Sequence, residues 1–194
     1  MPGADSHPAV FLDRDGTLNR DKGYVHRWAD WEWLTGAPEA LAYLKEAGYK
    51  LVVITNQSGV VKGYYSEEDV RELHRRVNLD LAGQGPTAAV LDAFYFCPHH
   101  PNYSGPCSCR KPAPGLIRRA AAEHNLDLSR SFMVGDKLID AAAGEKAGCR
   151  PILVLTGYGR AEADLAPPGL TVAADLAAAV RLILAAGDEP GEHG

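Results

Sequence analysis

Short, uninterrupted runs of apolar residues recur along the chain at wide spacing. They cover residues 9–12 (AVFL), 51–55 (LVVIT), 132–134 (FMV) and 152–155 (ILVL), and a weaker run covers 170–173. Runs of this length without polar alternation are typical of strands in a parallel sheet, because helices cover both faces of such a sheet. We therefore predict five parallel strands.

Segments with helix start and stop signals separate these runs. Pro38 opens one helix that runs to Gly48, and Ser66 with Asp69 forms a capping-box-like start for a second. The other predicted helices begin near Pro114, at Leu138 and after a cap at Asp175, and the last ends at Gly187. Alternating strands and helices predict a three-layer, Rossmann-like α/β fold with a parallel sheet.

No repeat or linker interrupts this pattern. We predict a single domain over residues 1–194, with its core at about 9–186 and a flexible polar tail at 187–194. Aromatic and polar residues alternate from Trp28 to Trp33, which predicts a short strand or a flap with one face packed inward.

Composition and charge narrow the class of protein. The chain is 46% hydrophobic and 23% charged, enough to bury a core, and its net charge of −5 argues against binding a nucleic-acid backbone. No apolar run approaches the roughly 20 residues that span a bilayer, and the first residues lack the pattern of a signal peptide. We expect a cytoplasmic protein, monomeric, that acts on a small anionic substrate.

Acidic side chains follow the first predicted strand. Asp13 and Asp15 lie two positions apart, so both side chains point the same way on an extended backbone. Like charges this close are costly unless a cation or a shared proton relieves them, and Mg²⁺ prefers such oxygen ligands. The alternative at this point is a solvated acidic turn.

Polar residues also follow the second and third of these runs, at the strand ends where parallel sheets place their chemistry. Residues 55–58 (TNQS) offer donors for phosphoryl oxygens, or form an ordinary turn. Asp136 is either a metal ligand or a helix cap, and Asp140, one turn later, either supports it or lies on an exposed helix face.

Three of the four cysteines crowd into one loop. Cys97, His99, Cys107 and Cys109 form a C-x-H…C-x-C arrangement, a full tetrahedral set for Zn²⁺ with no open position, so the predicted site is structural. We favour His99 over His100 because it repeats the spacing of the second pair. Cys149 is predicted to be a buried apolar residue.

Two basic residues, Arg110 and Lys111, directly follow the second cysteine pair. A lysine near the carboxylates would neutralise like charge, and an arginine would grip a second oxygen-rich part of the substrate. Without the neighbouring metal loop, the pair would be ordinary surface charge. A metal that fixes the loop would also position both cations.

The segment AVFLDRDGTLN resembles the first motif of the haloacid dehalogenase superfamily of phosphohydrolases, an apolar strand followed by D-x-D-x-T. TNQSG looks like its second motif. Together with GYVH, CPHHP, CSCRKPAPGL and VGDK, these segments resemble the zinc-loop, histidinol-phosphate phosphatase-like family, from about Ala9 to Gly159. The resemblance implies a three-layer fold without a large cap and with a zinc-stabilised loop.

It also implies roles for individual residues. Asp13 would be the nucleophile and Asp15 the general acid and base, with Mg²⁺ held by the carboxylates of Asp13 and Asp136 and the backbone carbonyl of Asp15. Gly16 would allow the turn and Thr17 would help to hold it. Thr55 and Lys111 would stabilise the phosphoryl group. The residues that would contact the substrate are Asp21, Lys22, Gly23, Tyr24, Thr55, Asn56, Gln57, Ser58, Arg110, Lys111 and Lys137.

The activity implied is hydrolysis of the C7 phosphate of a heptose 1,7-bisphosphate through an aspartyl-phosphate, giving heptose 1-phosphate for nucleotide-activated heptose synthesis, as in lipopolysaccharide biosynthesis. The loop from His100 to Pro106 is short and approaches the length seen in histidinol-phosphate phosphatases, so histidinol phosphate or another small metabolite is the alternative substrate. A non-catalytic, zinc-stabilised binding protein is disfavoured, because each expected strand end carries its reactive residue.

Overall fold

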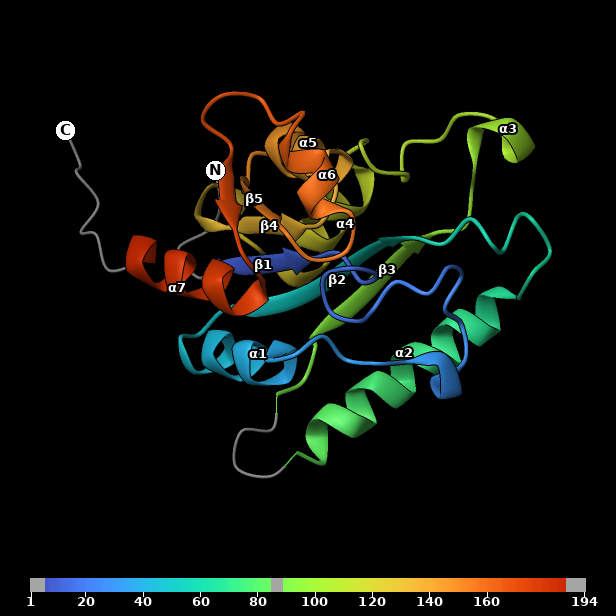
Figure 1. The fold of residues 1–194 in the computed structure, drawn as a ribbon, viewed down its shortest axis with the longest axis horizontal. Coiled ribbons are helices and arrows are strands. Elements are labelled where there is room, and N and C mark those ends of the chain that lie inside the picture. Colours follow the sequence, from blue (N-terminus) through green and yellow to red (C-terminus); the bar gives the residue numbers. More distant parts are fainter. Residues whose placement is uncertain (1–5, 85–88, 188–194) are drawn as a thin grey trace.

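A single parallel sheet organises the residues described by the computed structural model, 6–84 and 89–187. Across the sheet the strands follow the order β3-β2-β1-β4-β5-β6 (Figure 1). Their bounds are β1 Ala9–Leu12, β2 Lys50–Asn56, β3 Ala93–Cys97, β4 Phe132–Gly135, β5 Arg150–Val154 and β6 Thr171–Ala173. The predicted parallel α/β fold is confirmed, and β1, β2 and β4 lie side by side at its centre.

Helices connect the strands and cover the sheet on both sides (Figure 1). The α-helices are α1 Ala37–Glu46, α2 Glu67–Ala82, α3 Pro101–Ser104, α4 Gly115–His124, α5 Leu138–Ala147, α6 Gly159–Ala163 and α7 Leu176–Gly187, and two short 3₁₀ helices are η1 Trp28–Asp30 and η3 Leu128–Arg130. The predicted capping box at Ser66 is present, since its hydroxyl accepts from the backbone N–H of Asp69. None of the described helices is long and apolar enough to cross a membrane.

Alternate residues of each central strand enter different cores. Val10 and Leu12 of β1 pack with α1, α2 and α7, whereas Ala9 and Phe11 pack with α4 and α5. All four side chains are fully buried. β1 has no polar position because helices cover both faces of the sheet, so every side chain of the strand packs against apolar side chains.

The edge strand β3 was not predicted. Its aromatic sequence, AFYFC, is only alternately buried: Tyr95 and Cys97 face the α4 side, while the ring of Phe94 stacks on His74 of α2. A half-covered edge strand lacks the continuous burial that marks the central strands. The strand nevertheless matters for the site, because Cys97 is its last residue.

The tryptophan segment is a flap and not a strand. Trp28 begins η1, and the segment makes only one described bridge, between Trp33 and Asn19. Trp28, Trp31 and Trp33 all pack partly buried against the core, as predicted for one face. Of the two predicted alternatives, a short strand or a flap, the flap is the one found, since the first part of the segment bonds within a tight turn, as Trp31 does to the carbonyl of Trp28.

Gly187 ends α7, and residues 188–194 of the predicted tail lie outside the described residues. The described residues add no separate cap to the sheet and its covering helices. The carboxyl ends of β1, β2 and β4 therefore meet at one edge, which is where ligands bind in such sheets.

Candidate active site

A cavity of about 280 Å³ opens at this edge. Most of the predicted catalytic and substrate-contacting residues line it: Asp13, Asp15, Asp21, Gly23, Tyr24, Thr55, Asn56, Gln57, Ser58, Lys111 and Lys137. Two predicted substrate contacts, Lys22 and Arg110, do not. Lys22 pairs with Glu32 at 3.0 Å, and Arg110 donates from Nη1 to the carbonyl of His99 at 3.0 Å.

A buried ammonium lies between two carboxylates in the floor of this cavity. Lys111 Nζ is 2.6 Å from Asp13 Oδ1 and 2.7 Å from Asp140 Oδ1, and it donates to the carbonyl of Ile54 at 2.6 Å. Burial alone would lower the pKa of Lys111, but the charges of Asp13 and Asp140 outweigh burial and raise it. The lysine therefore stays charged beside the expected nucleophile.

Asp140 is thus not on an exposed helix face. Its side chain is 2% exposed, and its second oxygen accepts from the backbone N–H of Lys137 at 3.1 Å, which caps α5. Burial and the charge of Asp13 raise its pKa, while Lys111 opposes that rise. Both carboxylate oxygens of Asp140 are occupied by nitrogen donors, so it acts as a support for Lys111.

Asp136 is also fully buried, but one of its oxygens accepts no hydrogen bond. Oδ2 accepts from the backbone N–H of Tyr158 at 2.9 Å, whereas Oδ1 makes no hydrogen bond with any described residue and lies 4.0 Å from Lys137 Nζ. Gly16 and Gly157 close around it, since a Cβ on either glycine would approach Asp136 Oδ2 to 2.2 Å. A buried oxygen without a donor is costly unless a cation binds it.

The carboxylates of Asp13, Asp136 and Asp140 each offer an oxygen within 4.8 Å of the others. Burial, and next the charge of Asp13, raises the pKa of Asp136 to about 7. The carboxylate of Asp15 is outside this group. Asp13 and Asp136 are thus the residues whose carboxylates fit a divalent cation.

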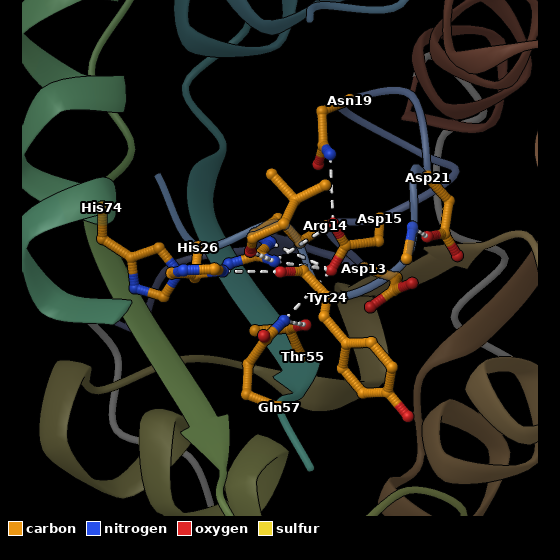
Figure 2. A network of polar contacts seen from close by, with 12 residues as sticks. Asp13, Arg14, Asp15, Asn19, Asp21, Tyr24, His26, Thr55, Gln57 and His74 are labelled. Carbon is orange, nitrogen blue, oxygen red and sulfur yellow. Dashed lines mark hydrogen bonds and ion pairs between the residues drawn. The ribbon is translucent and has the colours of Figure 1, made fainter. Parts of the chain in front are cut away.

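Donors surround the carboxylate of Asp15 instead (Figure 2). Gln57 Nε2 donates to Asp15 Oδ2 at 3.0 Å and to Thr55 Oγ1 at 2.9 Å, and Tyr65 donates its hydroxyl to Gln57 Oε1 at 2.7 Å. Because Thr55 Oγ1 accepts from Gln57, its own proton remains available for an oxygen in the cavity. Thr17 Oγ1, expected to help hold the turn, has no partner among the described residues.

The second polar segment also holds the catalytic loop in place. Asn56 accepts from the backbone N–H of Lys111 at 3.1 Å and donates to its carbonyl at 3.2 Å. On the opposite wall, Lys137 Nζ lies 3.7 Å from Asp21 Oδ2 and 4.4 Å from the ring centre of Tyr158. The cavity therefore presents Lys111 at its floor and Lys137 at its side.

The cysteine loop forms a closed group. Cys109 Sγ is 3.0 Å from Cys97 Sγ, 3.3 Å from Cys107 Sγ and 3.3 Å from His99 Nδ1. All four potential ligand atoms lie within 4.8 Å of one another. His100 is excluded, as favoured from the spacing, because its ring accepts from the backbone N–H of Asn102 and caps α3.

These thiols do not form disulfides, and burial raises the pKa of Cys97. Three thiolates cannot share this space without a cation, so the cluster is suited to a metal such as Zn²⁺. Cys149 is buried, and burial raises its pKa, as expected for an unreactive apolar residue.

Known proteins share this sequence and geometry. Residues 108–179 match the HAD-hydrolase-like family model. The D-glycero-beta-D-manno-heptose-1,7-bisphosphate 7-phosphatase of Haemophilus ducreyi is 44% identical over 81% of this chain and 91% of its own. The D-glycero-D-manno-heptose-1,7-bisphosphate 7-phosphatase of Thermosynechococcus vestitus is 44% identical over 91% of this chain and 95% of its own. This chain belongs to the heptose-bisphosphate phosphatase family.

A solved structure of the same family supports this membership. The D,D-heptose 1.7-bisphosphate phosphatase from B. bronchiseptica, complexed with magnesium and phosphate, matches with a TM-score of 0.84 and 37% identity, over 92% of this chain and 99% of that one. The haloacid dehalogenase-type fold and the class of enzyme, a phosphatase, are therefore established. The magnesium in that relative agrees with the oxygen-ligand group found here.

Three cavity residues carry no signal that sequence reasoning used: Tyr65, Ile139 and Tyr158 line the cavity although no motif marks them. Arg14 is fully buried and does not line the cavity. Asp140 had a signal, one helical turn after Asp136, but its direction was left open. Only the packing of α5 against the sheet decides that this face points inward.

The pKa of Asp136 leads to a test of the folded protein without added divalent cations. In the unfolded chain this carboxyl has its ordinary pKa of 3.8, so protonation favours the folded state, and that contribution is lost as the pH rises from about 4 through about 7. We expect the melting temperature of the wild type to fall between about pH 5 and about pH 7.5 by more than that of Asp136→Asn. Thermal unfolding at both pH values measures this, and equal falls in the two proteins would contradict it.

Proposed function

We propose that this chain removes the C7 phosphate of D-glycero-D-manno-heptose 1,7-bisphosphate through an aspartyl-phosphate on Asp13. The observation that carries the proposal is the placement of Lys111 Nζ 2.6 Å from Asp13, in a cavity bordered by Thr55 and Asp15. The names of the relatives at 44% identity support the choice of substrate. The product is heptose 1-phosphate, a substrate for nucleotide-activated heptose synthesis.

We assign the divalent site to the carboxylates of Asp13 and Asp136 with the backbone carbonyl of Asp15. The buried Oδ1 of Asp136, which accepts no hydrogen bond from any described residue, supports this assignment, since an oxygen-only set suits Mg²⁺. When bound, Mg²⁺ neutralises charge on the phosphoryl oxygens and orients them.

In the first half of the proposed reaction, a carboxylate oxygen of Asp13 attacks phosphorus and the bond from phosphorus to the sugar oxygen breaks. Asp15 gives its proton to that oxygen, so the sugar leaves as an alcohol. In the second half, Asp15 takes a proton from water, whose oxygen attacks phosphorus. Inorganic phosphate leaves and the Asp13 carboxylate is restored.

Two groups stabilise the charge that develops on the phosphoryl oxygens in both halves. The Lys111 ammonium is fixed by Asp13, Asp140 and a backbone carbonyl, and the Thr55 hydroxyl has a free proton. Donors held in place before the reaction need no reorganisation as charge develops. A primary phosphate at C7 reaches this depth more readily than the phosphate at the ring carbon C1.

The remaining polar groups are proposed to contact the rest of the sugar bisphosphate. Asp21, Gly23, Tyr24, Ser58 and Lys137 line the cavity above the reacting carboxylates. Tyr24 has a φ of 54°, in the left-handed region, and its hydroxyl is 2.7 Å from Lys62 Nζ. Lys22, paired with Glu32, stays a proposal from the resemblance alone.

A phosphate-release assay tests the activity. We expect the wild type to release one phosphate from heptose 1,7-bisphosphate and leave C1 phosphorylated, and to lose activity without Mg²⁺. Asp13→Asn should abolish turnover while the protein stays folded, because it removes the nucleophile's charge and keeps its shape, and Asp140 still pairs with Lys111. A higher kcat/KM for histidinol phosphate, or turnover by Asp13→Asn near the wild-type rate, would overturn the proposal.

Arg110 is proposed to recognise the second anionic group of the substrate, although it does not line the cavity in this conformation. Its guanidinium donates to the carbonyl of His99 at the edge of the cysteine loop. Arg110→Ala should raise KM for the bisphosphate by roughly 10-fold or more and leave KM for a simple monophosphate ester nearly unchanged, since a bidentate contact to phosphate is lost. Equal changes for both substrates would remove Arg110 from substrate recognition.

We propose that Cys97, His99, Cys107 and Cys109 hold one structural Zn²⁺ per chain. The four ligand atoms leave no open position for water, so the metal would stabilise the loop that ends in Lys111. Cys107→Ala should lower the zinc content, the melting temperature and kcat/KM together. Cys149→Ala is the matched control and should keep the zinc. Metal analysis showing no zinc in wild type purified without chelator would contradict the assignment.

A further inference from the structure

Arg14 is fully buried, and the chemistry proposed above leaves it without a function. It lies between Asp13 and Asp15 in the chain, and its guanidinium turns back to form a fork with the Asp15 carboxylate (Figure 2). Nε donates to Oδ2 at 3.0 Å and Nη2 donates to Oδ1 at 3.1 Å. A two-point contact of this kind fixes the plane of a carboxylate, which a single ammonium cannot do.

The guanidinium is itself held from behind. Nη2 also donates to the carbonyl of Val25 at 2.5 Å, and Nη1 lies 3.5 Å from Nε2 of His74. Arginine keeps its proton, so His74 accepts here. Burial and the charge of Arg14 lower the pKa of His74 well below its ordinary value, which keeps the ring neutral. Its ring stacks on Phe94 at 4.4 Å, so the acceptor has a fixed position.

Four hydrogen bonds from described residues reach the Asp15 carboxylate. Besides the two from Arg14, Asn19 Nδ2 donates to Oδ1 and Gln57 Nε2 donates to Oδ2, both at 3.0 Å. A carboxylate has about four acceptor positions, so the ionised form is saturated. Of the three residues that donate, Gln57 lines the cavity and the other two do not. A proton or the leaving oxygen can therefore displace Gln57 while Arg14 and Asn19 stay in place.

We propose that Arg14, backed by His74, is a positioning residue that orients Asp15 for proton transfer. The inference rests on the proposed function, because it assumes that Asp15 gives a proton to the leaving oxygen and later takes one from water. Arg14 itself neither gains nor loses a proton. Its fork keeps Oδ2 directed at the cavity in both halves of the reaction, and geometry within hydrogen-bond reach is the first requirement for general acid catalysis.

Arg14→Lys keeps the charge and removes the fork. A sugar alcohol is a poor leaving group that needs the proton, whereas the phenolate of 2,4-dinitrophenyl phosphate leaves without one. We expect kcat/KM for heptose 1,7-bisphosphate to fall by about 100-fold and kcat/KM for 2,4-dinitrophenyl phosphate to change by less than about threefold. The reason is that kcat/KM reports only on the steps up to the departure of the leaving group, and only the sugar needs a proton from Asp15 in those steps. The Mg²⁺ concentration that gives half activation should stay unchanged.

Arg27→Lys is the matched control, since Arg27 pairs with Asp30 at 2.8 Å on the surface, and it should alter neither substrate's kcat/KM. His74→Phe keeps the stacked ring but removes the acceptor, and it should show a smaller loss confined to the heptose substrate. His74→Gln restores an acceptor and should recover part of that loss. If thermal unfolding shows that Arg14→Lys does not fold, the two His74 variants test the inference in its place.

Equal losses for both substrates in Arg14→Lys and in His74→Phe would overturn the inference, because a general distortion of the site affects both. No loss in either variant would overturn it as well. If the wild type itself fails to hydrolyse the bisphosphate, the proposed function fails. If the wild type hydrolyses it but the variants lose activity equally on both substrates, only the inference about Arg14 fails.

Discussion

Crowded negative charge at the carboxyl edge of the sheet is the constraint on which the site depends. Asp13, Asp136 and Asp140 place oxygens within 4.8 Å of one another, all buried from solvent. Lys111 Nζ contacts two of these carboxylates directly, and removing one partner from a buried pair costs about 3–5 kcal/mol. The third carboxylate, that of Asp136, keeps one oxygen that accepts no hydrogen bond from any described residue. One ammonium together with one divalent cation balances this arrangement.

Lys111 lies on a loop, so the position of its ammonium depends on contacts that are distant from the carboxylates. The loop has no core of its own, and the contacts that hold it include the cysteine and histidine cluster that ends at Cys109, the two hydrogen bonds between Asn56 and Lys111, and the bond from Lys111 to the carbonyl of Ile54. Cys97 pairs in register with Asn56 across β3 and β2, so the cluster and the amide are built on neighbouring strands. The cysteine and histidine cluster and Lys111 are thereby parts of one mechanical unit.

The two carboxylates of the D-x-D motif face different surroundings although they share a strand end. Asp13 meets Lys111 and the cation site, where charge is neutralised from the floor of the cavity. Asp15 is held by Arg14, Asn19 and Gln57, a set of donors that controls orientation. The same residue type can serve as a nucleophile in one setting and as a proton carrier in the other, because surroundings decide what a carboxylate can do.

Periodicity and local motifs in the sequence were enough to predict the central strands, the capped helix at Ser66, the D-x-D strand end and the metal-type spacing of the cysteine loop, because each depends on residues close together in the chain. Edge strand β3, the inward direction of Asp140, and the contacts of Arg14 with His74, 60 residues away, depend on which face of each element packs against the sheet. Tertiary packing alone decides such contacts, since burial and long-range pairing select one partner among many that the local sequence allows.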